Sequence, residues 1–251
     1  MRTARLCSIG LGGMLSGALS ASAVLAGAWP RDQGGVFASL AYELTTPEAA
    51  IQPEALALDP TPPLYSYTAL YAEYGLRPWL TVGLDTGQQE GPDTWSGVVF
   101  VRVPIGSQDG RHRFAVQLGL GQRRYEQEGP YYGIETIETE WIARPTLAWG
   151  MGFDSPWGPA WAGAEASVEW RADTAGQPVK LDLTTGVTIS PRTTVLLQLQ
   201  TGDYPDNPPY AKLLPGLVVR LLPWLSLESS AILSLVGDDK LGARTALWLE
   251  F

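Results

Sequence analysis

Few residues in this chain are able to perform acid–base or metal chemistry. Its 251 residues include one histidine, His112, and one cysteine, Cys7. A zinc site built from cysteine and histidine, or a disulfide framework, needs more of these side chains than the sequence offers. His112 directly follows an Asp-Gly-Arg turn, so we expect a solvated turn histidine. The sequence therefore predicts no histidine-dependent enzyme, no metal site and no cofactor, although its abundant acids leave a carboxylate-only mechanism open.

A larger set of polar groups is a series of charged side chains at alternate positions. Acids and bases in nearly equal number fall opposite an apolar face, so in a closed sheet they would line the interior. The side chains predicted to line it are Arg102, Arg113, Arg123, Glu138, Glu140, Arg144, Glu165, Glu169, Lys180, Asp182, Lys212, Arg220, Glu228 and Arg244. They form either structural cross-strand ion pairs or a selectivity lining that orients a zwitterionic or anionic solute. Arg144, for example, is expected to pair with Glu138 or Glu140.

Period-two alternation of apolar residues identifies the elements that hold these charges. Near the C-terminus, Leu247, Leu249 and Phe251 share one face, whereas Arg244 and Glu250 share the other. Helical spacing of apolar residues is not evident after residue 28. Twelve strands are predicted, at 35–45, 65–75, 79–87, 94–105, 112–124, 138–151, 160–171, 178–190, 193–202, 211–222, 224–235 and 241–251. Most have the roughly 9 to 11 residues that a tilted strand needs to cross a bilayer.

Composition and charge disfavour several classes of protein. Charged residues make up 17% of the chain, below the roughly 25% of ordinary soluble domains. The formal net charge of -9 disfavours nucleic-acid binding, which needs a basic surface. After residue 28, no uninterrupted run reaches the roughly 20 apolar residues of a spanning helix. Any membrane would therefore have to be crossed by the strands of a closed barrel.

Tight turns alternate along the sequence with longer loops that are rich in acids. Only Arg124 and Lys240 oppose the loop acids, which are Glu48, Glu54, Asp59, Glu90, Asp93, Glu126, Glu128, Glu135, Asp173, Asp203, Asp206, Asp238 and Asp239. If these loops surround one opening of a barrel, we expect that opening to concentrate cations at low salt. The same acids would also suit divalent ions, or would form a simple solvated surface.

Residues 1–28 have the pattern of a secretory signal peptide. Two arginines precede an apolar stretch, and Ala26-Gly27-Ala28 supplies the small residues needed for cleavage. The domain prediction is therefore a signal peptide at 1–28 and a β-barrel at 29–251, with its strands beginning after Gly34. N-terminal sequencing of the exported protein should give a start within a few residues of Trp29. Recovery of the uncleaved chain after export would contradict this prediction.

The aromatic residues and the C-terminus give the chain a family resemblance. Aromatic residues lie near both ends of the outward-facing rows, as in interfacial belts, and the last strand ends with Leu247, Leu249 and Phe251 at alternate positions. The chain thereby resembles Gram-negative outer-membrane β-barrel proteins, in particular small porin-like transporters with a C-terminal Phe assembly signal. The resemblance implies an all-β fold, a transmembrane antiparallel up-and-down barrel of about 12 strands, in the bacterial outer membrane.

The resemblance also implies partners and a function. The partners are outer-membrane lipids, lipopolysaccharide and the barrel-assembly machinery, which reads Leu247, Leu249 and Phe251. The function is passive passage or uptake of a small polar or amphiphilic solute. The alternative is a closed structural or interaction barrel that binds lipopolysaccharide or a partner through its acidic loops. Pro145 and Pro215 interrupt two predicted strands, where we expect bulges or shifted strand boundaries because proline cannot donate to the ladder.

Overall fold

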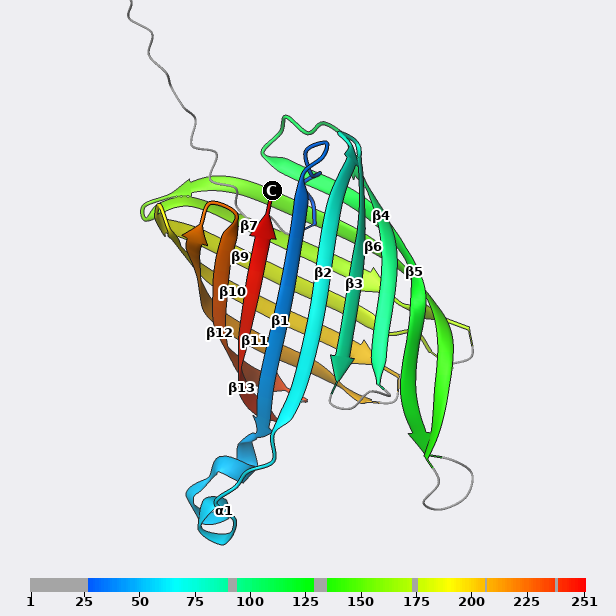
Figure 1. Cartoon of the computed structure of the whole chain (residues 1–251), viewed down its shortest axis with the longest axis vertical. Helices are drawn as coiled ribbons and strands as arrows, with labels where there is room; N and C mark the ends of the chain where they lie inside the picture. The colour runs from blue at the N-terminus through cyan, green and yellow to red at the C-terminus, as the bar shows by residue number, and fades with distance from the viewer. Residues whose placement is uncertain (1–26, 90–93, 129–134, 173–175, 206, 238) are drawn as a thin grey trace, which may run out of the picture.

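Antiparallel strands make up most of the chain. The computed structural model describes residues 27–89, 94–128, 135–172, 176–205, 207–237 and 239–251. The first strand, β1 (Val36–Pro47), pairs along nearly its whole length with the last, β13 (Lys240–Glu250). This pairing closes the sheet into a barrel (Figure 1). No helix among the described residues is long and apolar enough to span a membrane.

The strands between β1 and β13 pair in the order of the sequence. Their bounds are β2 (Tyr65–Arg77), β3 (Leu80–Gln89), β4 (Trp95–Ile105), β5 (His112–Glu128), β6 (Glu135–Ser155), β7 (Gly158–Val168), β8 (Trp170–Arg171), β9 (Val179–Ser190), β10 (Thr193–Tyr204), β11 (Asn207–Leu222) and β12 (Leu225–Val236). The short β8 continues β7 along β6 in unchanged register, so the two form one interrupted strand. The barrel therefore has 12 strands around its circumference, which confirms the predicted fold class and strand number.

Alternate residues of each strand point to opposite sides of the barrel wall. On β4, Val99 and Val101 are 62% and 46% exposed, whereas Val98 and Phe100 are 1% and 3% exposed. Leu118 on β5 and many other large apolar residues are likewise exposed on the outside. A wall covered by large apolar side chains suits contact with lipid, because monomeric soluble proteins rarely expose such extensive apolar surface.

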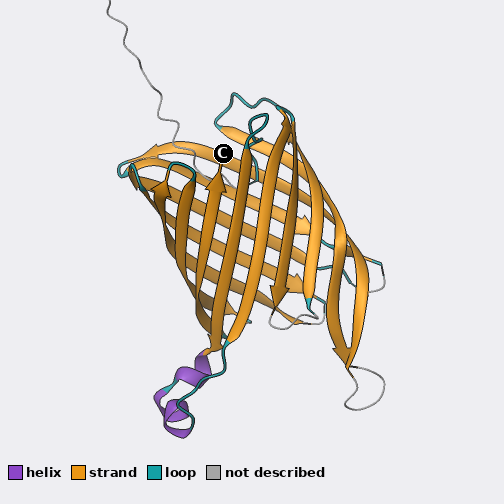
Figure 2. Ribbon diagram, in the orientation of Figure 1, coloured by secondary structure: helices purple, strands orange, loops and turns teal. Residues whose placement is uncertain are grey.

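The two ends of the barrel differ in their connections (Figure 2). The turn end, where β1 begins and β13 ends, has two-residue connections except between β4 and β5, and the opposite end, the loop end, has the longest connection, between β1 and β2. At the loop end the β1–β2 connection forms a 3-10 helix, η1 (Glu48–Ile51), and an α-helix, α1 (Pro53–Leu58). These helices were not predicted from the sequence, because the 6 residues of α1 are too few to show an apolar period.

Pro145 and Pro215 do not create the expected bulges. Pro145 lies opposite Leu118, and Pro215 lies opposite Leu197, each in register with its neighbours on that side. Each proline instead coincides with a gap in pairing on its other side, toward β7 and β8 or toward β12. Because a strand residue directs its N–H toward only one neighbour, the missing donor costs bonds on one side and the register is retained.

Candidate functional site in the barrel interior

The N-terminal segment, residues 27–31, lies inside the barrel ahead of β1. Ala28 is fully buried against Ala115 and Ala148, and Trp29 packs against the same cluster. Gly150 on β6 makes room for the Trp29 ring, since a Cβ at this position would fall 2.0 Å from it. The sequence did not predict this placement, because the segment precedes the first alternating stretch. Of the predicted signal peptide, residues 1–28, all but Gly27 and Ala28 lie outside the described residues.

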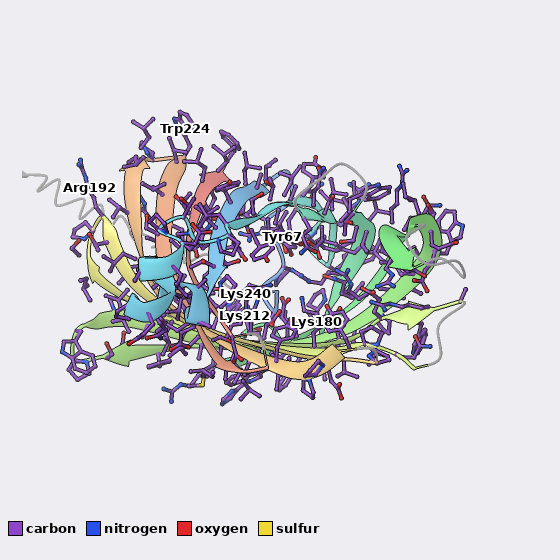
Figure 3. All side chains as sticks on the ribbon, turned by 90° about the horizontal axis from the view of Figure 1, so that it is seen from below. Tyr67, Lys180, Arg192, Lys212, Trp224 and Lys240 are labelled. Atoms are coloured by element: carbon purple, nitrogen blue, oxygen red, sulfur yellow. The ribbon has the colours of Figure 1, made fainter. Side chains whose placement is uncertain are left out.

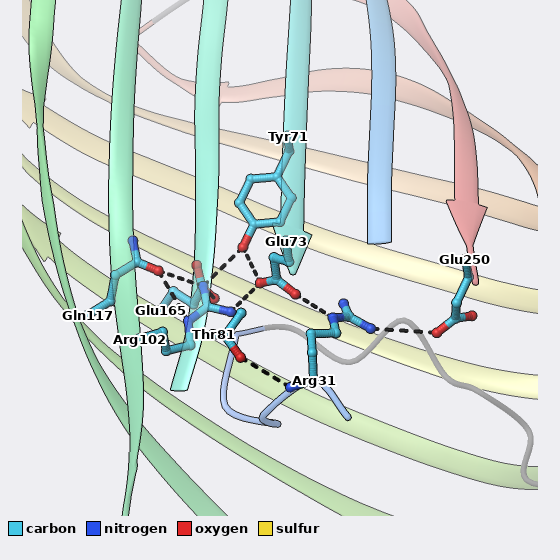
Figure 4. Close-up of polar contacts among 8 residues, drawn as sticks. All are labelled: Arg31, Tyr71, Glu73, Thr81, Arg102, Gln117, Glu165 and Glu250. Carbon is cyan, nitrogen blue, oxygen red and sulfur yellow. Dashed lines mark hydrogen bonds and ion pairs between the residues drawn. The ribbon is translucent and has the colours of Figure 1, made fainter. Parts of the chain in front are cut away.

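Arg102 is the centre of a buried polar network near the turn end (Figure 4). Its guanidinium donates to the Glu73 carboxylate, to the Tyr71 hydroxyl at 3.0 Å, and to Gln117 Oε1 at 2.7 Å and 3.1 Å. Tyr71 also donates to Glu73, so this carboxylate accepts from both a cation and a phenol. Arg102 and Glu73 are only 2% and 4% exposed. Charges buried to this degree are stable only when paired and hydrogen-bonded, as these are.

Arg31 of the N-terminal segment extends this network across the interior. Its Nε donates to Glu73 Oε2 at 2.5 Å, and its terminal nitrogen lies 3.5 Å from Glu250 on β13. On the other side, Arg102 lies 3.7 Å from Glu165 on β7, a strand that is not a neighbour of β4. The network therefore ties the N-terminal segment to β2, β4, β7 and β13.

Arg144 forms a second bridge between strands that are not neighbours. Its guanidinium lies 2.5 Å from Asp85 on β3 and 3.0 Å from Glu169, which lies between β7 and β8. Arg171 also pairs with Glu169, at 2.8 Å. Like the Arg102 network, this bridge joins parts of the wall that lie apart in the sheet, so it crosses the interior.

The partners expected for Arg144 from the sequence are wrong. Glu140 pairs instead with Arg123 on β5, at 2.6 Å. The β5–β6 register sets Arg123 directly opposite Glu140, whereas it sets Gly119 opposite Arg144. The glycine presents no side chain to Arg144, which reaches across the interior to more distant carboxylates.

Arg244 joins two carboxylates on the strands beside its own. Its guanidinium lies 2.5 Å from Glu43 on β1 and 3.3 Å from Glu228 on β12. Glu228, 1% exposed, also accepts hydrogen bonds from Gln198 Nε2 at 3.2 Å and from Ser230 Oγ at 3.1 Å. These contacts are cross-strand pairs, one of the two arrangements that the sequence allowed.

Basic residues and tyrosines gather at the loop end of the interior. Lys180, Lys212 and Lys240 lie with Tyr67 around the middle of the barrel when it is viewed from this end (Figure 3). Lys180 interacts electrostatically with Asp182 and with Tyr67. The loop end of the barrel therefore has lysine and tyrosine side chains in its interior as well as the acidic side chains of its loops.

Three of the predicted lining residues lie apart from the networks. Arg113 and Arg220 are half-buried, and Glu138 is exposed. Among the described residues, no carboxylate lies within 4.0 Å of the Arg113 or Arg220 guanidinium. These two arginines therefore form no direct ion pair with a described carboxylate, although Arg220 interacts electrostatically with Glu250.

The interior also holds buried apolar side chains beside the charges that the alternation pattern predicted there. Leu196, Leu214 and Ile232, on the inner side of β10, β11 and β12, are 2%, 1% and 1% exposed. Trp161 and Val218 pack with Leu196 in this part of the barrel. The interior therefore holds the Arg102 and Arg144 networks, which centre on β2 to β7, and buried apolar side chains on β10 to β12 beside the Arg244–Glu228 pair.

The residues singled out for chemistry or ion binding lie at the two ends. His112 is exposed and stacks on Trp149, whose indole N–H donates to His112 Nδ1 at 3.2 Å. Within the described ranges, no group of three or more His, Cys, Asp or Glu residues is placed to hold a metal ion. The loop acids with described side chains, all exposed, are Glu48, Glu54, Asp59, Asp203 and Asp239. The side chains of the other predicted loop acids lie outside the described part of the chain.

The C-terminal residue helps to close the barrel. Phe251 exchanges two backbone hydrogen bonds with Val36, each 3.0 Å long, and its ring stacks on Trp224 with centroids 6.1 Å apart. We expect deletion of Phe251 to reduce the yield of assembled barrel, because these contacts and the terminal aromatic group are lost together. Heat-modifiable gel migration measures this yield, with Phe251→Tyr as the conservative control. Equal folded yields for the deletion and the native chain would contradict the expectation.

A closed antiparallel barrel with an apolar outer wall and ion pairs inside has the architecture of outer-membrane β-barrels. The COG4313 outer membrane channel from Pseudomonas putida F1 has a similar fold, with a TM-score of 0.59, 8% identity, and coverage of 89% of this chain and 98% of the channel. The KdgM porin gives a TM-score of 0.54 at 8% identity, covering 85% of this chain and 99% of the porin. The translocator domain of the autotransporter NalP from Neisseria meningitidis gives 0.50 at 8% identity, covering 88% of this chain and 90% of that domain.

These similarities establish the fold and leave the activity to the site. At 8% identity a shared barrel shows a shared architecture, and a porin, a channel and a translocator domain already differ in what their names describe. The sequence matches no protein-family model and no curated protein.

Proposed function

We propose that the protein is an outer-membrane barrel for passive passage or uptake of a small polar or amphiphilic solute, and is not an enzyme. The supporting observation is the distribution of polarity, with paired charges inside the wall and apolar side chains outside it. In this proposal outer-membrane lipids surround the wall, lipopolysaccharide adjoins the loop end, and the barrel-assembly machinery reads Leu247, Leu249 and Phe251. The turn end then faces the periplasm.

The interior contacts restrict the solute to a small one. The Arg102 and Arg144 networks bridge strands that are not neighbours, and the N-terminal segment occupies space beside them. A solute would pass fixed charges of both signs, which suits a zwitterion or a polar molecule with separated partial charges. Arg31 and Trp29 anchor the segment that narrows this path.

Planar-bilayer conductance of the purified protein tests the proposal. We expect the native barrel to conduct weakly and the Trp29→Ala/Arg31→Ala variant to conduct more, because the segment loses its apolar and its ionic anchor together. Arg77→Gln, an exposed charge at the turn end, is the matched control and should not change conductance. Equal conductance in the native protein and the double variant would contradict a constriction formed by this segment.

Reversal potentials distinguish the effect of the loop charges on ion selectivity from the effect of the interior charges. Asp238→Asn/Asp239→Asn should weaken a low-salt cation preference and leave high-salt conductance unchanged, because the Debye length falls from about 30 Å at 0.01 M to about 3 Å at 1 M. Arg144→Ala should alter conductance at all salt concentrations, since Asp85 and Glu169 then lose their partner inside the barrel. An anion preference at low salt would instead assign control to the inner arginines and lysines.

The buried apolar side chains of β10 to β12 favour one alternative function, a closed structural or interaction barrel. Leu196, Leu214 and Ile232 fill interior space with side chains that no polar solute would contact favourably. This barrel would bind lipopolysaccharide or a partner through its acidic loops. Absence of conductance under every salt condition, for the native chain and the Trp29→Ala/Arg31→Ala variant alike, would support this alternative and reject passage.

A further inference from the structure

A cavity of about 430 Å³ lies at the turn end of the barrel interior. Phe37, Trp161 and Trp248 line it with aromatic rings, and Phe37 and Trp248 meet edge to face with centroids 6.2 Å apart. Leu196 and Val218, nearly fully buried, add aliphatic surface. The volume falls within the roughly 300–1,000 Å³ of pockets that hold small molecules.

The rim of this cavity is positively charged. Arg192 and Arg220 both line it, and the Arg220 N–H donates to the Arg192 carbonyl oxygen at 2.8 Å, so the two residues are held at the same edge. Of the described carboxylates, none lies within 4.0 Å of either guanidinium. Glu250, which also lines the cavity, lies 3.5 Å from Arg31 and interacts electrostatically with Arg220, so one carboxylate faces several guanidinium groups at this rim.

We propose that this cavity binds a single-chain carboxylate amphiphile, with the carboxylate at Arg220 and Arg192 and the hydrocarbon chain against Trp161 and Trp248. Apolar walls favour the chain because its transfer out of water is favourable in proportion to the area buried. Neither guanidinium is in direct contact with a described carboxylate, so both can donate charge-assisted hydrogen bonds to an anionic head, and such bonds are stronger than neutral ones. A cationic head would meet repulsion at the same rim.

This site goes beyond the proposed passage function, because binding at the turn end requires no conduction. A barrel that proved closed to solutes would still present the cavity and its charged rim. A binding measurement therefore tests the site separately from the passage proposal.

Equilibrium dialysis of labelled decanoate against the barrel in lipid nanodiscs tests the site, with binding to empty nanodiscs subtracted. We expect saturable decanoate binding, roughly tenfold or more weaker in Arg220→Gln, with decanol binding nearly unchanged by that substitution. Octanoate should bind about fourfold more weakly for each methylene removed. Arg111→Gln, an exposed arginine in a different turn at the same end, is the matched control and should bind decanoate as the native barrel does.

A second pair of variants tests the cavity itself. Ser226→Phe should abolish saturable decanoate binding by filling the space beside Trp248, which lies opposite Ser226 in the β12–β13 register. Folding is checked by heat-modifiable migration, and Thr194→Phe on β10 replaces this variant if Ser226→Phe does not fold. Equal binding of decanoate and decanol in both the native barrel and Arg220→Gln would overturn the anionic head group. No saturable decanoate binding, or unchanged binding in a folded cavity-filling variant, would overturn the site.

Discussion

Arg102→Met is expected to lower the free energy of unfolding by about 3 kcal/mol. The substitution leaves Glu73, 4% exposed, with only Arg31 and Tyr71 as hydrogen-bonding partners. Removing one member of a buried ion pair costs roughly 3–5 kcal/mol, because the other charge stays buried without its partner. We expect the lower part of this range, since Arg31 still neutralises Glu73. The urea midpoint of the folded barrel, followed by tryptophan fluorescence, measures the loss.

Two further variants identify the cause of that loss. Arg102→Met/Glu73→Gln should recover much of the stability, because the uncompensated carboxylate is removed with its partner. Arg113→Met removes an inward arginine that no described carboxylate approaches within 4.0 Å, so it should have a small effect. If Arg102→Met and Arg113→Met lower the midpoint equally, the loss comes from packing or net charge and not from the buried pair.

Leu183→Arg is expected to destabilise the assembled barrel by roughly 2 to 4 kcal/mol, because it places a charge in lipid near the bilayer midplane. Leu183 on β9 is 38% exposed on the outer side of the wall, with Ala164 and Leu199 opposite it on the neighbouring strands. Leu227→Arg, on the outward face of β12, should act in the same way. The yield of the folded, heat-modifiable band in lipid vesicles measures both effects.

Leu183→Ala is the matched control for this charge effect. It removes the same apolar side chain without introducing a charge, so we expect a much smaller loss of folded barrel. Comparable losses for Leu183→Ala and Leu183→Arg would show that packing at this position matters more than exclusion of charge from lipid. Unchanged folded yield for both arginine variants would mean that the outward face does not contact lipid.

Much of the fold could be predicted from the sequence, because a strand's inside and outside are set by a local period of two residues. From Val98 to Val101, side chains are alternately buried inside the barrel and exposed on its outer wall. The last strand, β13, has the same period of two residues as β1, with which it pairs. The strand number follows from counting such segments between turns. The helix α1 and the full extent of β5 and β6 did not follow, because short helices and strand ends outside the apolar rows carry no such period.

The candidate site was predicted only in part. Arg102 and Arg144 were placed among the interior charges by parity, but Arg31 was not, since it precedes the first alternating strand. The inward-facing Leu196 left a weaker signal: Leu196 and Leu197 are both apolar, and because successive residues of a strand face opposite sides, one of the two must face inward.

The sequence by itself therefore determined the strands, the two faces of the wall and the charges available to the interior. Only the tertiary structure decided which of those charges meet, as Arg144 meets Asp85 and Arg102 meets Glu165, and where a cavity remains. The physical reason is that the side of the wall to which a side chain points is fixed by the position of its residue along its own strand. Contact across the barrel instead depends on register, closure and side-chain reach between strands that are distant in the sequence.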